Sequence, residues 1–313
     1  MARCALTVDV EEYFQVSNFD SIIDRSSWSS LPSRVVAATR RLLDCFEANG
    51  HQATFFVLGW VAERHGALVR EIEARGHEVA CHGFGHELVY EIGPVRFRSD
   101  LRRARAAIED AAGVGVRGYR APSYSITDRS GWALRILVEE GFEYDSSIFP
   151  IRHPRYGIPD FSRRPVRLAL GGGASIVEFP LTTARLGPLR LPVAGGAYLR
   201  FMPAPLFRAL FGREVRAGRP TVLYLHPWEI DASQPRQRVT RRVAINHYTN
   251  LHRTEERVRR LLAEHSFGRM DRVLEELESR GALPLEPFES AVPAPSDAAT
   301  IRPVLAGTGS PEG

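Results

Sequence analysis

Short apolar runs alternate with segments of helical periodicity over the first 150 residues of the chain. The apolar runs are rich in β-branched and aromatic residues and predict buried strands at 5–10, 53–58, 77–81, 116–120 and 142–146. Segments with apolar residues at helical spacing lie between them, at 33–49, 61–75, 94–112 and 128–140. The first two of these segments are followed by Gly50 and Gly76, as helices commonly are. Repeated strand–helix alternation predicts an α/β fold with a parallel sheet, either open or closed into a barrel.

The pattern is less regular after residue 150. A glycine-rich turn at 171–175 precedes a predicted strand at 176–179, and TVLYL at 221–225 predicts a buried strand. Residues 250–281 predict two helices. From residue 286 onward Pro, Ala, Ser and Gly dominate, which is typical of disorder. We therefore expect one domain over 1–285 and a disordered tail over 286–313.

Composition and charge narrow the classes of function. Of the 313 residues 44% are hydrophobic and 25% charged, which is ordinary for a globular protein. All 41 cationic side chains are arginine, and the net charge is +4. They are not clustered with aromatic residues, so no nucleic-acid partner is expected. The absence of lysine excludes Schiff-base enzymes and Walker-type phosphate loops.

Cysteine usage and the N-terminal sequence predict the compartment. Cys4, Cys45 and Cys81 have no CxxC spacing and form no disulfide framework, which favours a reducing environment. The chain reaches acidic residues by position 9, without the apolar core of a signal peptide. It also lacks a run of about 18 apolar residues that could span a membrane. We therefore expect a cytoplasmic protein with no transmembrane segment.

Polar side chains lie at or just after the carboxyl ends of four predicted strands. They are Asp9, Glu11, His82, His86, Arg120 and His226. In parallel α/β folds the carboxyl ends of the strands meet at one edge of the sheet, where functional residues collect. We therefore expect these six side chains to converge on one site.

The segment HGFGH at 82–86 places two histidines four residues apart. Two imidazoles and one carboxylate form a standard open site for zinc or another divalent first-row metal. Gly83 and Gly85 disfavour a helix, so we expect a tight loop that brings His82 and His86 to one ion. The other histidines lack such neighbours, and we interpret them as surface or capping residues. They are His51, His65, His77, His153, His247, His252 and His265.

Four segments occur in a characteristic order: TVDVEEYF at 7–14, HGFGH at 82–86, RAPSY at 120–124 and YLHPWE at 224–229. They resemble the ordered motifs of the polysaccharide deacetylases, which are carbohydrate esterase family 4 and carry the NodB homology domain. The segments EEYFQV, YDSSIFP and HPWEID further resemble the deacetylases associated with exosortase-type exopolysaccharide systems. The resemblance implies a deformed (β/α) barrel over 1–285, in which 150–285 is the subgroup-specific C-terminal part.

The resemblance implies a set of metal ligands. In most members the acidic ligand directly follows the catalytic base, but this chain has Val10 there. Glu11 lies one residue further and points to the same side of an extended strand as the base. Glu11 is therefore the expected ligand, with Glu12 behind it, and His82 and His86 match the two histidine ligands of the family.

The resemblance also implies the catalytic residues. Asp9 matches the base, Arg120 the arginine that keeps the base charged, and His226 the general acid. The residue that donates a backbone amide to the oxyanion is usually aromatic in the family. Here Ser123 takes that place, with Tyr124 next to it.

Asp145 and Trp228 complete the implied site. Asp145 loosely matches the acid that tunes the catalytic histidine, and Trp228, like Tyr124, is a candidate contact for the sugar. The residues alone also permit structural readings, in which Asp9 and Arg120 form a plain buried salt bridge and His226 is a core histidine.

Taken together, these residues predict metal-dependent hydrolysis of the N-acetyl amide of amino sugars, with release of acetate. The expected cofactor is Zn²⁺, with Co²⁺ or Ni²⁺ suited to the same ligands. The expected partner is an N-acetylated polysaccharide or lipid-linked oligosaccharide, with peripheral association to a polysaccharide assembly complex.

Two alternatives belong to different functional classes. One is a hydrolase of another C–N bond, such as a cyclic amide in an allantoinase-like enzyme. The other is a catalytically silent sugar-binding protein, which the departures at Val10 and Ser123 leave open. Metal content distinguishes the silent protein from both hydrolases, and acetate release distinguishes the two hydrolases.

Overall fold

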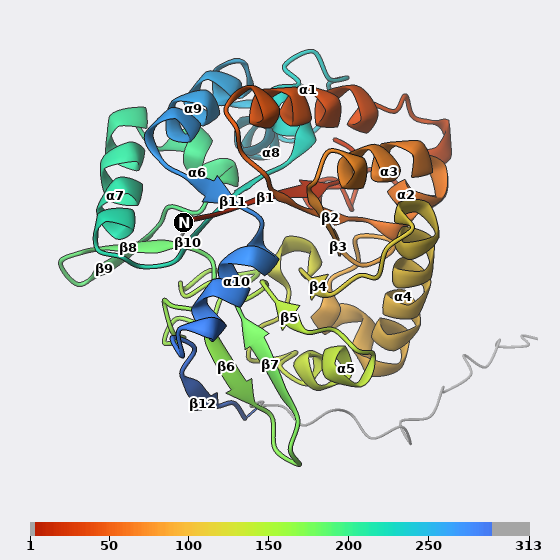
Figure 1. Ribbon diagram of the computed structural model, residues 1–313. Coiled ribbons are helices and arrows are strands. Elements are labelled where there is room, and N and C mark those ends of the chain that lie inside the picture. Colours follow the sequence, from red (N-terminus) through yellow and green to blue (C-terminus); the bar gives the residue numbers. More distant parts are fainter. Residues whose placement is uncertain (1–3, 290–313) are drawn as a thin grey trace, which may run out of the picture.

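A ten-stranded sheet surrounded by helices forms the centre of the protein in the computed structural model, which describes residues 4–289 (Figure 1). The strand order is β10-β1-β2-β3-β4-β5-β7-β6-β12, and β11 also pairs with β1. Neighbours from β10 through β7 are parallel, whereas β6 is antiparallel to β7 and β12 is parallel to β6. The strand bounds are β1 Cys4–Val10, β2 Thr54–Val57, β3 Glu78–Cys81, β4 Gly118–Tyr119, β5 Tyr144–Asp145, β6 Val166–Ala169, β7 Ser175–Glu178, β10 Thr221–Leu225, β11 Phe267–Gly268 and β12 Leu285–Pro287.

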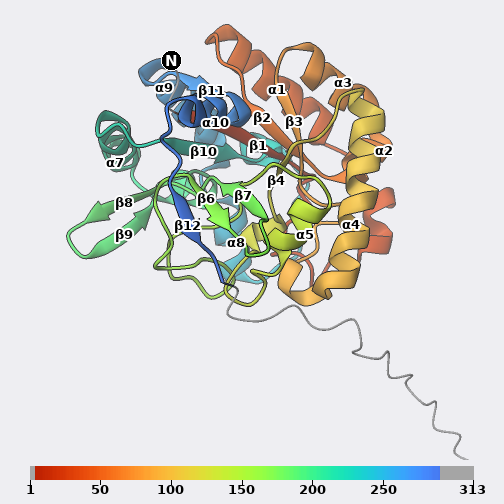
Figure 2. The same ribbon diagram turned by 60° about the horizontal axis from the view of Figure 1, so that its bottom comes forward.

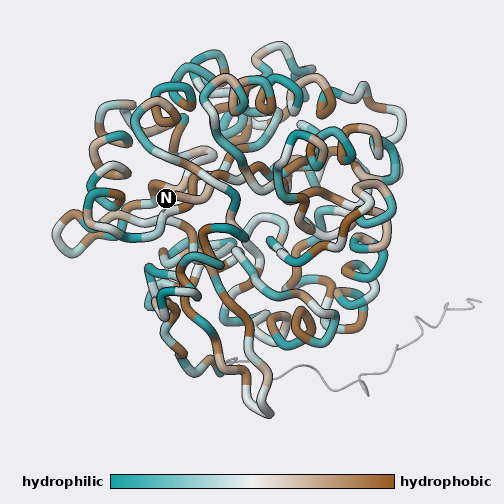
Figure 3. Tube along the Cα trace, viewed as in Figure 1, coloured by the Kyte–Doolittle hydropathy of each residue, from teal (hydrophilic) through white to brown (hydrophobic). Residues whose placement is uncertain are grey.

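Amphipathic helices cover the sheet. In Figure 3 they alternate between hydrophobic and hydrophilic colour along their turns, as helices with one face on a core do. On α1, for example, Val35, Leu42 and Phe46 are buried. The helix bounds are α1 Val35–Ala48, α2 Gly59–Arg64, α3 Gly66–Ala74, α4 Val89–Ala112, α5 Ala133–Glu139, α6 Gly196–Phe201, α7 Ala204–Arg216, α8 Arg241–Tyr248, α9 Leu251–Glu264 and α10 Met270–Ser279, with 3-10 turns η1 Arg25–Ser30, η2 Pro122–Tyr124 and η3 Pro227–Ile230.

The α/β fold with a parallel sheet is the one that the sequence predicts. Within residues 4–289 the sheet does not close into a barrel by hydrogen bonding, because its path ends at β10 and β12. The parallel order is interrupted where β6 and β7 form an antiparallel hairpin across the predicted turn at 171–175. In this hairpin Gly171, Gly172 and Gly173 all have positive φ.

Two predicted helices differ in their bounds. The segment expected to be one helix over 61–75 is two helices, α2 and α3, because the backbone at His65 is not helical. The helix expected from residue 94 begins earlier, at Val89, and contains a break at Gly93 with φ 71° just before Pro94. Proline is tolerated there because its missing N–H falls in the first turn of the helix that follows the break.

The structure between residues 150 and 250 is more regular than the sequence pattern indicates. Helices α6, α7 and α8 lie there, together with a small hairpin of β8 (Thr183–Leu186) and β9 (Leu189–Pro192). Further along, β12 pairs with β6 across the predicted domain boundary at 285, so regular structure continues to Pro287. The rest of the predicted tail, 290–313, lies outside the described residues.

The two ends of the strands have different surroundings. Helix α10 crosses the amino ends of the strands, as Figures 1 and 2 show, and its Met270 N–H donates to Thr54 Oγ1 at 2.8 Å. The carboxyl ends lie at the opposite edge of the sheet. Across residues 4–289, no helix combines the length and the apolarity needed to cross a membrane.

Candidate active site

The register of the sheet brings several strand ends to one level. Val10 pairs with Val57, which pairs with Cys81, and Cys81 pairs with Tyr119, which pairs with Asp145. The residue after each of these positions therefore leaves the sheet at the same edge. The pairing of β1 with β10 adds the end of β10 to this edge. All six side chains that were expected to converge lie here.

Asp9 and Arg120 form a buried ion pair at this edge. Arg120 Nη1 donates to Asp9 Oδ1 at 2.7 Å and to Thr7 Oγ1 at 2.8 Å, and the rest of the guanidinium donates to Ser146. Burial lowers the pKa of Arg120, but Asp9, Tyr124 and Tyr144 together outweigh it, and the pKa is raised. The buried charge of Asp9 is thus compensated through Oδ1, while Oδ2 lies 3.5 Å from Tyr124 Oη and 3.8 Å from His226 Nε2.

Glu11, His82 and His86 form a compact group beside this pair. Each offers one ligand atom, and these atoms lie within 4.8 Å of one another. Glu11 Oε2 is 2.8 Å from His86 Nε2. Burial raises the pKa of Glu11, but the neighbouring His86, His226 and His82 lower it to about 2. The carboxylate is therefore charged at any working pH.

The protonation of the two histidines suits a divalent ion. His82 Nδ1 donates to the carbonyl of Arg120 at 2.7 Å, which leaves the lone pair of Nε2 free, the usual arrangement of a metal-bound imidazole. Burial lowers the pKa of His82 to about 4, so the ring is neutral. His86 Nδ1 is buried without a hydrogen-bond partner among residues 4–289, and its backbone has φ 52°. The donor set of one carboxylate and two imidazoles fits a metal centre.

Glu12 has a different function from its neighbour. Its carboxylate accepts hydrogen bonds from the backbone N–H of Arg34 at 2.9 Å and of Val35 at 3.2 Å, and from the hydroxyl of Ser33. It therefore caps the amino end of α1, where Arg34 supplies no side-chain cap. Glu12 points away from the histidines, and Glu11 alone of the two lies with them.

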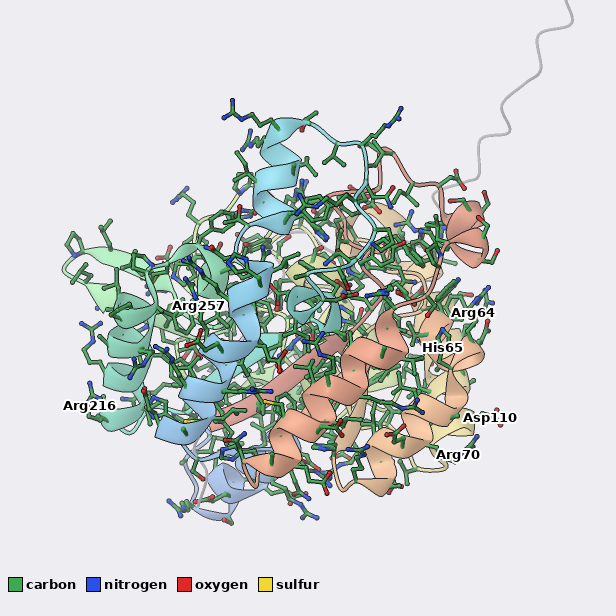
Figure 4. The ribbon with its side chains drawn as sticks, turned by 90° about the horizontal axis from the view of Figure 1, so that it is seen from above. Arg64, His65, Arg70, Asp110, Arg216 and Arg257 are labelled. Carbon is green, nitrogen blue, oxygen red and sulfur yellow. The ribbon has the colours of Figure 1, made fainter. Side chains whose placement is uncertain are left out.

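His226 is oriented by a carboxylate that the sequence interpretation missed. Its Nδ1 is 3.0 Å from Glu229 Oε2, and Arg200 Nε donates to the other Glu229 oxygen at 2.8 Å. Arg257 of α9, labelled in Figure 4, holds the Arg200 segment by donating to the carbonyls of Leu199 and Arg200. Burial lowers the pKa of His226, but Glu11, Glu229 and Asp9 raise it to about 9.

The i,i+3 spacing of His226 and Glu229 in HPWE is the sequence signal that could have identified Glu229 as this partner. His226 is the N-cap of η3, Pro227 is its first residue, and Glu229 bonds back to the His226 N–H at 3.1 Å, which forms a capping box. Asp145, the expected partner of His226, instead accepts from Ser147 Oγ at 2.6 Å. Asp145 lies beside Glu178, and burial together with Asp145 raises the pKa of Glu178 well above its ordinary value.

Ser123 and Tyr124 lie in a strained turn over the site. Both have positive φ, 51° and 55°, although neither is glycine. Ser123 Oγ is 2.7 Å from Ser17 Oγ, and Tyr124 is buried with its hydroxyl directed toward Asp9. Strain of this kind is concentrated at functional sites, where it fixes backbone groups in place.

Trp228 lies behind the site. Its ring stacks on His226 at 5.1 Å and on His247 at 4.3 Å, and its Nε1–H donates to Glu11 Oε1 at 2.9 Å. Both faces of the ring are thus in contact with histidines, so the structure does not present Trp228 as a platform for sugar. His247 was interpreted as a surface or capping residue, but it is 1% exposed because it lies beneath this indole.

Two models of known protein families match two successive parts of the chain. Residues 19–142 match a family model described as Polysaccharide deacetylase. This part of the chain is therefore similar to polysaccharide deacetylases. Residues 146–275 match a second model, described as Domain of unknown function (DUF3473). The site draws on both matched ranges, because His82 and Arg120 lie in the first and His226 in the second, while Asp9 and Glu11 precede both.

Individual relatives match over part of their length. A peptidoglycan deacetylase from Helicobacter pylori is 30% identical over 108 residues, which are 34% of this chain and 36% of that protein. The curated relatives are covered over only 15% to 37% of their own length.

Solved structures share the fold over nearly the whole chain. A protein assigned as a polysaccharide deacetylase from Mycobacterium smegmatis superposes with a TM-score of 0.60 at 22% identity, covering 92% of this chain and 94% of the other. Puue allantoinase superposes with a TM-score of 0.56 at 16% identity, covering 90% and 92%. Both comparisons establish the mixed α/β fold of the chain.

Proposed function

We propose that the protein hydrolyses the N-acetyl amide of amino sugars in an exopolysaccharide or its lipid-linked precursor, in a reaction that depends on a divalent metal and releases acetate. The observation that carries the proposal is the convergence of three groups at one sheet edge: the cluster of Glu11, His82 and His86, the Asp9–Arg120 pair, and His226. The match of residues 19–142 to the polysaccharide deacetylase model supports the reaction class.

Amide hydrolysis needs a base, an acid and a stabilised oxyanion. Asp9 takes a proton from the attacking water through Oδ2, the oxygen that Arg120 does not bind. His226 donates a proton from Nε2 to the leaving nitrogen, while Glu229 holds its Nδ1. Glu11, His82 and His86 would hold a zinc-type ion, which would supply the Lewis acid for the acetyl carbonyl.

The group that would stabilise the oxyanion is a backbone N–H near Ser123. We assign it the amide donor because positive φ at Ser123 and Tyr124 fixes this turn at the rim of the site. The Tyr124 hydroxyl is directed to Asp9 and supports the base. Trp228 makes no substrate contact in this proposal, because Glu11 accepts its N–H and histidines contact both of its faces.

We further propose that residues 4–285 act as one catalytic unit of the exosortase-associated subgroup. Support comes from the pairing of β10 in the second half with β1 in the first, which sets His226 against Asp9. The separate DUF3473 match over 146–275, which includes the HPWEID segment, is consistent with a specialised second half.

Acetate release from chitin oligomers tests the proposal. The protein is stripped with a chelator, reloaded with Zn²⁺ or Co²⁺, and assayed beside small cyclic amides. We expect acetate only from the metal-loaded protein. If only the cyclic amides are turned over, the other hydrolase class is favoured. If the protein does not bind about one metal ion per chain, a silent binding protein is favoured.

A further inference from the structure

The two oxygens of Glu11 have different neighbours. Oε2 faces His86 Nε2 at 2.8 Å, inside the proposed ligand group. Oε1 is turned away and accepts a hydrogen bond from the Trp228 indole N–H at 2.9 Å. His226 Nε2 is also 3.7 Å from Oε1, too far for a hydrogen bond but close enough to compete for this oxygen.

The indole is held rigidly from behind. Its ring stacks on His247 with an interplanar angle of 16°, and His247 Nε2 is bonded to Gln234 Oε1 at 2.8 Å. Gln234 Nε2 in turn donates to the backbone carbonyl of Trp228 at 2.8 Å. The Trp228 side chain is 7% exposed, and this packing holds its N–H against Glu11.

A glutamate ligand needs such a support more than an aspartate does. It has one more rotatable bond, and fixing a side chain of this length costs on the order of 1–2 kcal/mol in conformational entropy. A rigid donor on one oxygen selects one conformer before any ion arrives. It also occupies the oxygen that would otherwise bind the ion in a bidentate mode or pair with His226.

We propose that Trp228 is a positioning residue for the metal centre, which fixes Glu11 as a monodentate ligand through Oε2 by its indole N–H. The inference rests on the metal site of the proposed function. Partners of this kind, hydrogen-bonded to a ligand, affect metal affinity by about 10- to 100-fold.

The test is Trp228→Phe, which keeps an aromatic ring against His226 and His247 but removes the N–H. The dissociation constants of Zn²⁺ and Co²⁺ are measured on the stripped full-length protein by competition with a chromophoric chelator. We expect binding weaker by about 10- to 100-fold. We also expect an altered visible spectrum of bound Co²⁺, because a freed carboxylate changes the coordination geometry.

Trp28→Phe is the matched control. Trp28 is buried at 3% exposure, and its indole N–H has no hydrogen-bond partner within the described part of the chain. The same loss of ring size there should leave both the affinity and the Co²⁺ spectrum at their wild-type values.

Three outcomes contradict the inference in distinguishable ways. Wild-type affinity and spectrum in Trp228→Phe would show that the N–H does not position Glu11. An equal loss in Trp28→Phe would assign the effect to general packing. Failure of the wild-type protein itself to bind Zn²⁺ or Co²⁺ would remove the proposed metal site, and the inference with it.

Discussion

Two buried glutamates lie at opposite ends of the same sheet, and their pKa values are shifted in opposite directions. Glu11, at the carboxyl end of β1, has a pKa lowered to about 2, because His86, His226 and His82 outweigh the burial that would raise it. Glu78, at the amino end of β3, has a pKa raised to about 7, because burial and the neighbouring Asp271 act in the same direction. Residue type and burial are alike, so the difference comes from the neighbours.

At the amino end of β3, hydrogen bonds to Glu78 link helix α10 to the sheet. Glu78 accepts hydrogen bonds from Tyr144 Oη at 2.8 Å, from Thr54 and from the backbone of Asp271, where α10 begins. The arginine there, Arg269, pairs with Asp271 and not with Glu78. Glu78 thus ties α10 to the strands, and its pKa is raised by burial and Asp271. The pKa of Glu11 is instead lowered by histidines, so its carboxylate is ready to bind a cation.

The largest expected effect distinguishes the two glutamates by metal content. Glu11→Gln should lose metal and turnover together, because the site is left without its only anionic ligand. Glu78→Gln should keep about one ion per chain. Elemental analysis after dialysis measures both. Full occupancy in Glu11→Gln, or an empty site in Glu78→Gln, would contradict the assignment of metal binding to the carboxyl end.

The next largest effect is expected at His226, the proposed general acid beside Glu11. Removing a general acid costs about 10²- to 10⁴-fold, so His226→Ala should lose about that much turnover and retain its metal. An activated aryl acetate ester, whose leaving group needs no proton, should be much less affected. Equal losses on amide and ester would instead give His226 a structural or substrate-holding role.

The pH dependence of stability should differ between the two ends. A folded pKa above the ordinary 4.5 means that Glu78 contributes stability that is complete below about pH 4.5 and is lost as the pH rises through about 7. The shift from 4.5 to about 7 corresponds to about 3 kcal/mol at about 1.4 kcal/mol per pH unit. Glu78→Gln should remove this decline in the free energy of unfolding.

The contribution of Glu11 to stability changes with pH in the opposite direction. Its lowered pKa gives stability that is present above about pH 4.5 and is lost only as the pH falls through about 2. Glu11→Gln should therefore leave the decline between pH 4.5 and 7 intact. Urea unfolding of the metal-free protein across this range measures both variants. The decline would be misassigned if it vanished in Glu11→Gln and persisted in Glu78→Gln.

The smallest effect compares Glu11 with its neighbour. Glu12→Ala removes the cap of α1 and should lower the free energy of unfolding by about 1 kcal/mol, the usual cost of a lost cap. Metal content should stay at the wild-type level. Loss of metal in this variant would mean that Glu12, not Glu11, completes the histidine pair.

Much of the site could be predicted from the sequence because it depends on strand ends. Asp9, Glu11, His82, His86 and Arg120 follow short apolar runs, and parallel pairing brings such positions to one edge. Their position at the strand ends was therefore enough to predict that these side chains lie together.

The residues that escaped prediction depend on packing between distant segments. Trp228 meets Glu11 across 217 positions, and His247 lies under Trp228 only because α8 folds over η3. Asp145 was expected at His226 from a loose motif match, but the local capping geometry of η3 favours Glu229. The helices between 150 and 250 were missed because weak local periodicity there is overridden by tertiary packing.

The central claim is that the carboxyl end of the sheet divides its two acidic residues between base and ligand. It is tested most directly by measuring metal content and acetate release on the same samples of Asp9→Asn and Glu11→Ala. The account predicts that Asp9→Asn keeps about one ion per chain and loses turnover, whereas Glu11→Ala loses both. An empty site in Asp9→Asn, together with full activity in Glu11→Ala, would contradict it.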